Sequence, residues 1–415
     1  MASLSDKLKS LGVEVGAGGL PPPRPRNPYP IQQVMSGRFQ ETPHGEVFLV
    51  EKRYPLDRRQ GRATLRVTAS LQVIAEWARE PQLANIHPDA FAFLDTETTG
   101  LAGGTGTYAF LVGVGRYDGE VFHLVQFFMR DPIEESALLA GLTEFLHPSQ
   151  ALVTFNGKTY DVPLLNARYV TNDKISPLTS AAHLDLLPLA RRLWRDRLSS
   201  RALGQLEEHI LDAMRTQEDV PGWLIPSLYF DYLRSGDARP LKSVFYHNAM
   251  DILSMAALLS HIAKLLDNLP KTPGTLEQAD VHGLDLVAMG KLFEDLGHLE
   301  TAAKLYEDGL GHSLPEEAHW ETVQRLSLVQ KRRGDLAAAI SLWRKAAHND
   351  QVYAFVELAK YFEHQERDYH EAIGWTKAAI ALVKSPSFLR GTRHQWLTDL
   401  EHRLARLQRK YQRSS

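Results

Sequence analysis

The sequence predicts an α/β fold with a mixed sheet, in which three antiparallel strands precede a strand–helix–strand unit, followed by an all-α domain of helical repeats. Short apolar runs separated by glycine-containing turns predict the buried strands. The last third of the chain instead has helical periodicity and repeats itself at intervals of about 34–37 residues. A chain of 415 residues is long enough for two or three domains.

The chain before the sheet divides into two predicted parts. Residues 1–35 are expected to be a flexible segment, because residues 21–26 form a proline-rich stretch. Residues 36–89 are expected to be an extension with a hairpin around residues 42–45 and a helix near residues 71–79.

Residues 90–270 carry the predicted sheet. The apolar runs predict three strands, then a strand, a helix and a further strand, and finally a long helix with two apolar stripes. The predicted strands lie at 91–95, 109–116, 121–128, 151–155 and around 183–185; the helices begin near 160 and 245.

Residues 275–413 are predicted to be helical throughout. Segments beginning at Gly297, Gly334 and Asp368 each place small alanines before a bulky aromatic residue. Small residues allow paired helices to approach closely, and stacked pairs form a surface that can bind protein segments. The alternative is that the repeats only cover and stabilise the preceding domain. Pro270, Pro273 and Gly274 mark the predicted boundary with the preceding domain, where few contacts should cross.

Two acidic residues end the first predicted strand of the sheet. Asp95 and Glu97 are two residues apart, so their side chains share one face of the strand. Carboxylates held together at the end of a buried strand repel each other, and a hard divalent cation such as Mg²⁺ would relieve that repulsion. The pair therefore predicts a metal site.

Two further acids follow on predicted helices. Asp161 lies where a helix opens, so it is a candidate ligand and also a candidate helix cap. Asp251 lies on a helix with an apolar stripe on either side, so it is expected to be buried and to need a cation or a partner. His247, four residues before Asp251, lies on the same face of that helix.

The order of these four acids resembles the DnaQ-like (DEDD) exonuclease superfamily, which has a ribonuclease-H-like fold, and residues 90–267 cover the resemblance. With its helical repeats, the chain more closely resembles the YprB-type bacterial branch, in which such a domain precedes tetratricopeptide helices. The resemblance implies cleavage from the 3′ end by two Mg²⁺ or Mn²⁺ ions. It implies that the metal ligands are Asp95, Glu97, Asp161 and Asp251, and that the residues near the terminal nucleotide are Thr98, Gly100, Leu101 and Asn156.

The identity of the general base is less direct. Members of the superfamily carry a His five residues before the last Asp or a Tyr four residues before it, whereas here Tyr246 is five and His247 is four residues before Asp251. We expect His247 to be the base because an imidazole titrates near neutral pH. Tyr246 is the alternative base. If neither acts as the base, His247 would be an ordinary core histidine hydrogen-bonded to a neighbour. Asp185 is expected to have a structural role.

The composition excludes some classes of protein. There is no cysteine, which rules out disulfides and thiolate metal sites and is compatible with the cytoplasm. No apolar run approaches about 20 residues, so no membrane span is expected. A net charge of −3 does not indicate nucleic-acid binding, but basic residues cluster at 52–66 and 191–201. These clusters are either a rim for a polyanion or an ordinary solvated face.

The sequence therefore predicts a metal-dependent nuclease, specifically a 3′→5′ exonuclease on DNA with a single-stranded 3′ end as substrate. A role in DNA repair is an analogy, and the helical repeats are candidates for binding a protein partner. The alternatives on the same fold are a ribonuclease-H-type endonuclease and an RNA exonuclease. The alternative of another class is an inactive adaptor that acts through its repeats, which the four intact acids disfavour.

Overall fold

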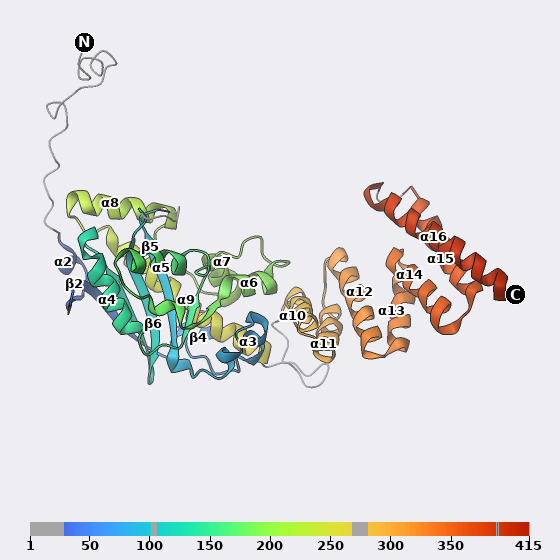
Figure 1. Cartoon of the computed structure of the whole chain (residues 1–415), viewed down its shortest axis with the longest axis horizontal. Helices are drawn as coiled ribbons and strands as arrows, with labels where there is room; N and C mark the ends of the chain where they lie inside the picture. Colours follow the sequence, from blue (N-terminus) through green and yellow to red (C-terminus); the bar gives the residue numbers. More distant parts are fainter. Residues whose placement is uncertain (1–28, 101–105, 268–280, 387, 389, 415) are drawn as a thin grey trace, which may run out of the picture. The chain divides into compact units, whose positions relative to one another are not determined.

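A computed structural model describes residues 29–100, 106–267, 281–386, 388 and 390–414. Their strands form a seven-stranded sheet and a two-stranded ribbon, and the C-terminal part is helical (Figure 1). Contacts within the chain group the residues into two units. The first unit contains Met1–Arg66, His87–His183 and Ala213–Ala257, and the second contains Val67–Ile86, Leu184–Asp212 and Leu258–Ser415.

The large sheet has the strand order β1-β2-β7-β6-β5-β8-β9. Neighbours from β1 to β5 pair antiparallel, whereas β5 and β8 pair parallel, so the predicted mixed sheet is confirmed. The hairpin of β1 and β2 adds to the edge at β7, so it belongs to the sheet itself and not to an extension before it. The strands are β1 Arg38–Thr42, β2 Gly45–Pro55, β5 Phe91–Thr98, β6 Ala109–Asp118, β7 Val121–Phe128, β8 Ala151–Thr154 and β9 Ala182–Asp185.

Most of the segment predicted to be flexible, residues 1–28, lies outside the described residues. Its end is structured, because α2 (Ile31–Val34) buries the side chain of Ile31 in the core of the first unit. The two-stranded ribbon consists of β3 (Arg59–Gln60) and β4 (Ala63–Thr64). The remaining helices before residue 268 are α3 Gln72–Ala78, α4 Glu135–Leu146, α5 Asp161–Thr171, α6 Leu186–Trp194, α7 Leu203–Leu206, α8 Ile225–Ser235 and α9 Leu241–Asp267.

Helices α4 and α9 cover opposite faces of the sheet. In β7, Gln126 donates a hydrogen bond to the carbonyl of Phe245 on α9, whereas its neighbour Phe127 packs beside Gly141 of α4. Successive residues of a strand point to opposite faces, so these two contacts place the two helices on different sides. In the core of this unit, Phe110 of β6 and Tyr229 of α8 stack with ring centroids 4.0 Å apart.

A buried ion pair fixes α5 against α4. Arg168 donates to both carboxylate oxygens of Glu135 at 2.6 Å, and both side chains are almost fully buried. A bidentate pair of this kind sets orientation as well as distance. The start of α5, where Asp161 lies, is therefore held by a rigid contact about two turns further along the same helix.

Of the described residues, only α9 is long and apolar enough by composition to cross a membrane. Most of its apolar window is buried within the protein, as expected for a core helix. The two apolar stripes predicted for this helix are confirmed, since Phe245, Ala249 and Ile252 on one stripe and Met255, Leu258 and Ile262 on the other are all buried.

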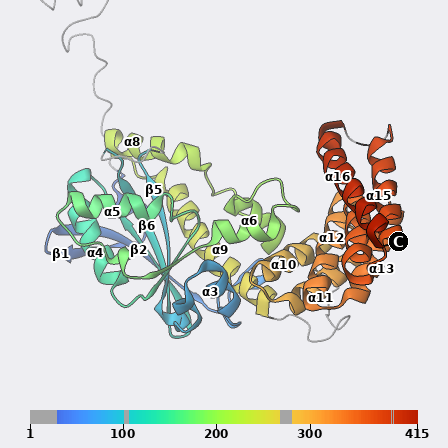
Figure 2. The same ribbon diagram turned by 45° about the vertical axis from the view of Figure 1, so that its right-hand side comes forward.

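The C-terminal part consists of helices that pack successively, each on the next along the chain, as Figure 2 shows. The three recurring segments begin α11, α13 and α15, and each has buried alanines: Ala302 and Ala303, Ala339, and Ala372. Gly297 and Gly334 have positive φ and end the preceding helices. The helices are α10 Gly283–Asp295, α11 Leu299–Leu310, α12 Glu316–Arg333, α13 Leu336–His348, α14 Val352–Tyr361, α15 Tyr369–Lys384 and α16 Arg390–Ser414.

The division into two units differs from the predicted boundary near residue 270, which itself lies outside the described residues. Within the second unit, α6 packs against α10, which comes after that boundary. Arg192 pairs with Asp295 at 2.5 Å and Arg197 with Asp285 at 2.5 Å. Residues 184–212 therefore make strong contacts with the helices that follow residue 281.

Candidate active site

The four acids singled out from the sequence lie close together in the first unit. Asp95 and Glu97 end β5, Asp161 is the first residue of α5, and Asp251 lies in the middle of α9. Glu97 and Asp161 are buried, whereas Asp95 and Asp251 are half-buried. Residues far apart in the sequence thus meet beside the second half of β5, an inner strand of the sheet.

The electrostatics of the acids reflect this grouping. Burial, followed by the charges of Asp251, Glu97 and Asp161, raises the pKa of Asp95 well above its ordinary value. Burial and the charges of Asp251 and Asp161 likewise raise the pKa of Glu97 well above its ordinary value. The group accumulates negative charge in a setting where water screens it poorly, which is the setting that favours a bound cation.

Three of the acids also have a polar partner from the protein. The hydroxyl of Thr96 donates to Asp161 at 2.5 Å, Asn248 donates to Asp95 at 2.9 Å, and Arg215 donates to Asp251. Among the described residues, no group of three or more His, Asp or Glu side chains is arranged around one ion-sized point. The set of oxygen donors nevertheless fits a hard divalent cation such as Mg²⁺ or Mn²⁺, provided that the carboxylates rearrange around the ion.

Asn248 fixes the orientation of Asp95 across the sheet. Its Oδ1 accepts a hydrogen bond from Gln126 at 2.9 Å, so its Nδ2 is directed to the carboxylate of Asp95. Gly113 pairs with Asp95 on one side and with Gln126 on the other, and a Cβ at Gly113 would lie 2.2 Å from Oδ1 of Asn248. The glycine therefore leaves the space through which Asn248 reaches the acid.

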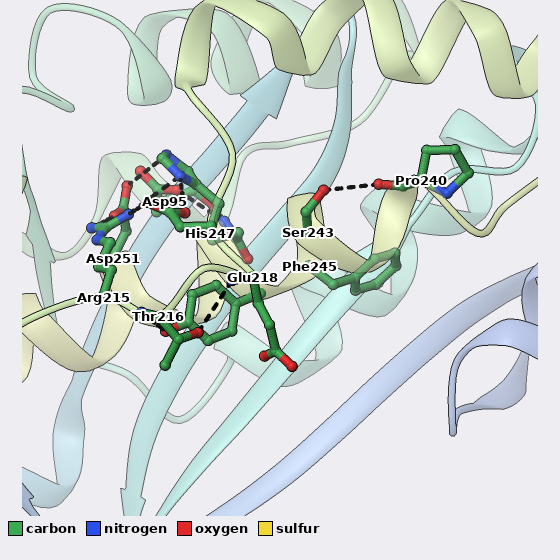
Figure 3. A network of polar contacts seen from close by, with 12 residues as sticks. Asp95, Arg215, Thr216, Glu218, Pro240, Ser243, Phe245, His247 and Asp251 are labelled. Atoms are coloured by element: carbon green, nitrogen blue, oxygen red, sulfur yellow. Dashed lines mark hydrogen bonds and ion pairs between the residues drawn. The ribbon is translucent and has the colours of Figure 1, made fainter.

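Arg215 reaches into the acidic group from residues 212–221, which contain no helix or strand (Figure 3). Its Nη2 donates to Oδ1 of Asp251, and its Nη1 lies 3.4 Å from Oδ2 of Asp219. Its charge lowers the pKa of Glu97, opposing the larger effect of burial and of the neighbouring acids. A guanidinium thus lies among the proposed metal ligands.

Asp219, which lies in the same segment as Arg215, holds the ring of His247. Its Nδ1 lies 2.8 Å from Oδ1 of Asp219 and 3.2 Å from Nη1 of Arg215. One ring nitrogen cannot donate and accept at once, and the shorter carboxylate contact assigns the proton to Nδ1. The Nε2 of His247, 3.7 Å from Oδ2 of Asp251, is then the atom with an acceptor lone pair.

Tyr246 has a different role. Its phenolic oxygen accepts a hydrogen bond at 3.0 Å from the backbone N–H of Thr216, next to Arg215. It therefore anchors the backbone of the segment that carries Arg215 and Asp219.

Of the four residues predicted to approach a terminal nucleotide, Thr98, Gly100 and Asn156 are described, whereas Leu101 lies outside the described residues. The hydroxyl of Thr98 donates to the carbonyl of Gly100 at 2.9 Å, beyond an irregularity in the pairing of β5 with β6. Asn156 adopts a positive φ of 67° at the end of β8.

Asp185 is a helix cap. Its carboxylate accepts a hydrogen bond from the backbone N–H of Leu187 at 3.0 Å, at the start of α6.

Three arginines of the basic cluster at 191–201 have partners within the protein. Arg192 and Arg197 are paired with Asp295 and Asp285, and Arg201 donates to the carbonyls of Leu198 and Ser199. In the cluster at 52–66, Arg53 pairs with Asp118 and Arg66 with Glu120. Much of the basic charge in both clusters is thus bound to acidic side chains or to the backbone.

Arg215, Asp219 and Asn248 were not found from the sequence. Arg215 and Asp219 lie in a segment without periodicity, so no pattern connects them with α9. Asn248 carried a usable signal, because a polar side chain beside His247 on an otherwise apolar helix needs a buried partner.

Three comparisons relate the chain to known proteins. The sequence profile of the RNase_H superfamily matches residues 92–263. The uncharacterized protein YprB of Bacillus subtilis (strain 168) is 33% identical over 326 residues, which cover 77% of this chain and 74% of that protein. Among solved structures, the family B DNA polymerase of the archaeon Pyrobaculum calidifontis matches with a TM-score of 0.33 and 16% identity, covering 50% of this chain and 29% of the polymerase.

The match to the superfamily supports a nuclease-type, hydrolytic function. The extent and the sequence identity of the match to the Bacillus protein show that the two proteins belong to one family. The chain therefore belongs to the YprB family, with a domain of the ribonuclease H superfamily before its helical C-terminal part.

Proposed function

We propose that the chain is a metal-dependent nuclease of the DEDD type that degrades nucleic acid from the 3′ end, with DNA as its substrate. The observation that carries the proposal is the grouping of Asp95, Glu97, Asp161 and Asp251, whose charges raise the pKa of Asp95. Structural acids are usually paired with cations or scattered, whereas four acids close enough to raise one another's pKa are a donor set suited to a two-metal site.

In this proposal the four carboxylates would hold two Mg²⁺ or Mn²⁺ ions, which would polarise the scissile phosphate and lower the pKa of the attacking water. Asn248 keeps Asp95 directed toward the other acids through its hydrogen bond of 2.9 Å. The backbone around Thr98 and Gly100 would lie against the terminal nucleotide.

His247 is the proposed general base. Because Asp219 holds Nδ1 at 2.8 Å, the lone pair of Nε2 is available to accept the proton of the attacking water. Asp219 acts through His247 and is a positioning residue, since it selects the tautomer and the ring orientation. The hydrogen bond of Tyr246 to the backbone of Thr216 supports a structural role for the tyrosine.

The experiment is incubation of the full chain with 5′-labelled single-stranded DNA, duplex DNA and RNA, in Mg²⁺ or Mn²⁺. We expect a ladder of products shortened from the 3′ end, strongest on single-stranded DNA. Asp95→Asn is the matched control and should be inactive, because it removes a charged ligand without changing the size of the side chain. Wild-type activity in Asp95→Asn would contradict the site.

A circular single-stranded DNA separates the two nuclease classes. An exonuclease leaves the circle intact, whereas cleavage of the circle would favour the ribonuclease-H-type endonuclease. Preference for a linear RNA would instead favour an RNA exonuclease.

We also propose that the helices from residue 283 onward form tetratricopeptide-type pairs that bind a protein partner. The recurrence of alanine-rich segments at the start of α11, α13 and α15 supports this assignment. A cytoplasmic location and a role in DNA repair belong to the same proposal. Copurification of a partner with the full chain, and its loss when exposed side chains of α11, α13 and α15 are substituted, would test the binding role.

A further inference from the structure

Arg215 brings a positive charge among acids that a divalent cation would also bind. Its side chain is 14% exposed, and its Nη2 is hydrogen-bonded to Oδ1 of Asp251. Its Nη1 is 3.4 Å from Asp219, and Glu97 is close enough to experience its charge. The guanidinium therefore offsets the same repulsion that a metal ion would offset.

A guanidinium and a metal ion compete for the same oxygen. The lone pairs of Asp251 Oδ1 that accept from Arg215 are those that a hard cation would use. The guanidinium and the metal ion each require a short, directed contact with that oxygen. Two cations in contact with one carboxylate would also repel each other across a site that water screens poorly. Entry of the metal ion at Oδ1 of Asp251 therefore requires Arg215 to move.

The surrounding contacts allow the side chain to move while its backbone stays in place. The N–H of Thr216 is held at 3.0 Å by the phenolic oxygen of Tyr246, and Val220 is buried further along the same segment. Arginine has a long flexible stem, and its planar donor fork matches the oxygens of a phosphate as well as those of a carboxylate. A displaced Arg215 would remain next to the reacting phosphate.

We propose that Arg215 is an internal counter-ion of this site: it neutralises Asp251 until a divalent cation displaces it, and it then binds the phosphate backbone of the nucleic acid. The inference rests on the proposed nuclease function. It gives the residue two successive partners, a carboxylate of the protein and a phosphate of the substrate.

The first test measures the metal ion without any substrate. Mn²⁺ binding to the full chain is followed by calorimetry for wild type, Arg215→Gln, Arg215→Lys and Arg234→Gln. Arg234 is an exposed arginine of α8 that pairs with Asp231, so its substitution removes the same charge away from the site. We expect Arg215→Gln to bind Mn²⁺ about tenfold more tightly or better, and Arg234→Gln to match wild type. Unchanged or weaker binding by Arg215→Gln overturns the inference.

The second test uses thermal unfolding and separates this role from an ordinary structural ion pair. In EDTA, Arg215→Gln should unfold at a lower temperature than wild type because the acids lose their counter-ion. Saturating Mn²⁺ should remove that difference, since the metal ion takes over the neutralisation. If the unfolding temperature of Arg215→Gln stays below that of wild type in saturating Mn²⁺, Arg215 has only a structural role.

Activity measurements test the second partner. With Mn²⁺ saturating, Arg215→Gln should raise the KM for single-stranded DNA roughly tenfold or more, and Arg215→Lys should recover part of the loss, because lysine keeps the charge but not the donor fork. An unchanged KM would overturn the phosphate-binding role.

The proposed function fails in a distinguishable way. If wild type and Asp95→Asn both lack saturable Mn²⁺ binding, the metal site itself is wrong. If wild type binds Mn²⁺ through Asp95 and Arg215→Gln behaves as wild type, only the inference about Arg215 is wrong.

Discussion

At the scale of single residues, the segment 212–221 contributes as much to the site as the acids do. Asp219 holds one ring nitrogen of His247, and Arg215 donates to the carboxylate of Asp251. Both residues come from a stretch without helical or strand periodicity, so the sequence pattern could not assign them. The four acids and His247, by contrast, follow recognisable strands and helices.

Substitutions of His247 and its neighbours should lower turnover by amounts that reflect the role of each residue. His247→Ala should lower turnover by about 10²–10⁴, the usual contribution of a general base, while Mn²⁺ binding is kept. Asp219→Asn should approach the same loss, because an amide can stabilise the wrong tautomer of the ring. Tyr246→Phe should be milder, since it removes one hydrogen bond to the backbone of Thr216. The measurement is kcat for each variant at saturating Mn²⁺.

If kcat falls strongly in Tyr246→Phe and stays close to wild type in His247→Ala, the general base is Tyr246 and not His247. A normal Asp219→Asn would show that the ring is held adequately without its carboxylate.

The raised pKa values of Asp95 and Glu97 predict how stability depends on pH in EDTA. A carboxyl whose pKa is higher in the folded state binds more protons there than in the unfolded chain. Its favourable contribution is therefore complete below the unfolded-state pKa of about 4 and is lost as the pH rises through the folded-state pKa. The Tm of wild type relative to Asp95→Asn should fall as the pH rises.

Mn²⁺ should reverse that trend, because the ionised carboxylates are its ligands and protons compete with it at low pH. The comparison is the difference in Tm between the two proteins at each pH, which cancels the response of groups elsewhere. A difference that stays constant from pH 4 to pH 8 would mean that Asp95 titrates normally.

At the scale of elements, β6 and α9 approach closely at Gly113. A methyl group there would lie 2.2 Å from Oδ1 of Asn248, so Gly113→Ala should destabilise the fold by about 1–3 kcal/mol, as overpacking usually does. It should also weaken Mn²⁺ binding, because Asn248 could no longer orient Asp95. Denaturant unfolding and Mn²⁺ titration measure the two effects.

Asn248→Ala provides the internal check, because the three atoms nearest to the added methyl group all belong to the Asn248 side chain. The double variant should recover part of the stability lost in Gly113→Ala, with a coupling of about 1 kcal/mol or more. Strictly additive losses would place the clash elsewhere. Gly204→Ala, where nothing lies within 4 Å, should leave both measurements close to wild type.

At the scale of the whole molecule, the sequence predicted the mixed sheet and the helical C-terminal part because each rests on local periodicity. It did not predict that β1 and β2 extend the sheet at β7, since strand pairing over about 70 residues leaves no local pattern. It also treated the arginines at 191–201 as surface charge, although Arg192 and Arg197 pair with acids of α10. Partners about 90–100 residues away in the chain cannot be found by reading charge alone.

A chain that ends after Asp267 tests the extent of these contacts. Truncation removes Asp285, Lys291 and Asp295, the partners of Arg197, Asp196 and Arg192. It also removes α10, which packs on α6. We therefore expect the truncated protein to unfold at least about 5 °C below the full chain, or to aggregate.

Circular dichroism melts of the two proteins make this comparison, and Mn²⁺ titration shows whether the four acids are still assembled. A soluble truncated protein with an unchanged Tm would instead support the independent domain that residues 90–270 were predicted to form.

Asp95, Gly113 and Gln126 are paired neighbours on three adjacent strands, and Asn248 bonds to the first and the last of them. This arrangement limits which substitutions the family can accept. A side chain at position 113 is tolerable only if position 248 has already become small, and a small residue at 248 leaves Asp95 without its donor. Each single step is therefore disfavoured, although the combined change could be accepted. Across relatives, we expect positions 113, 126 and 248 to be inherited as a block and replaced together.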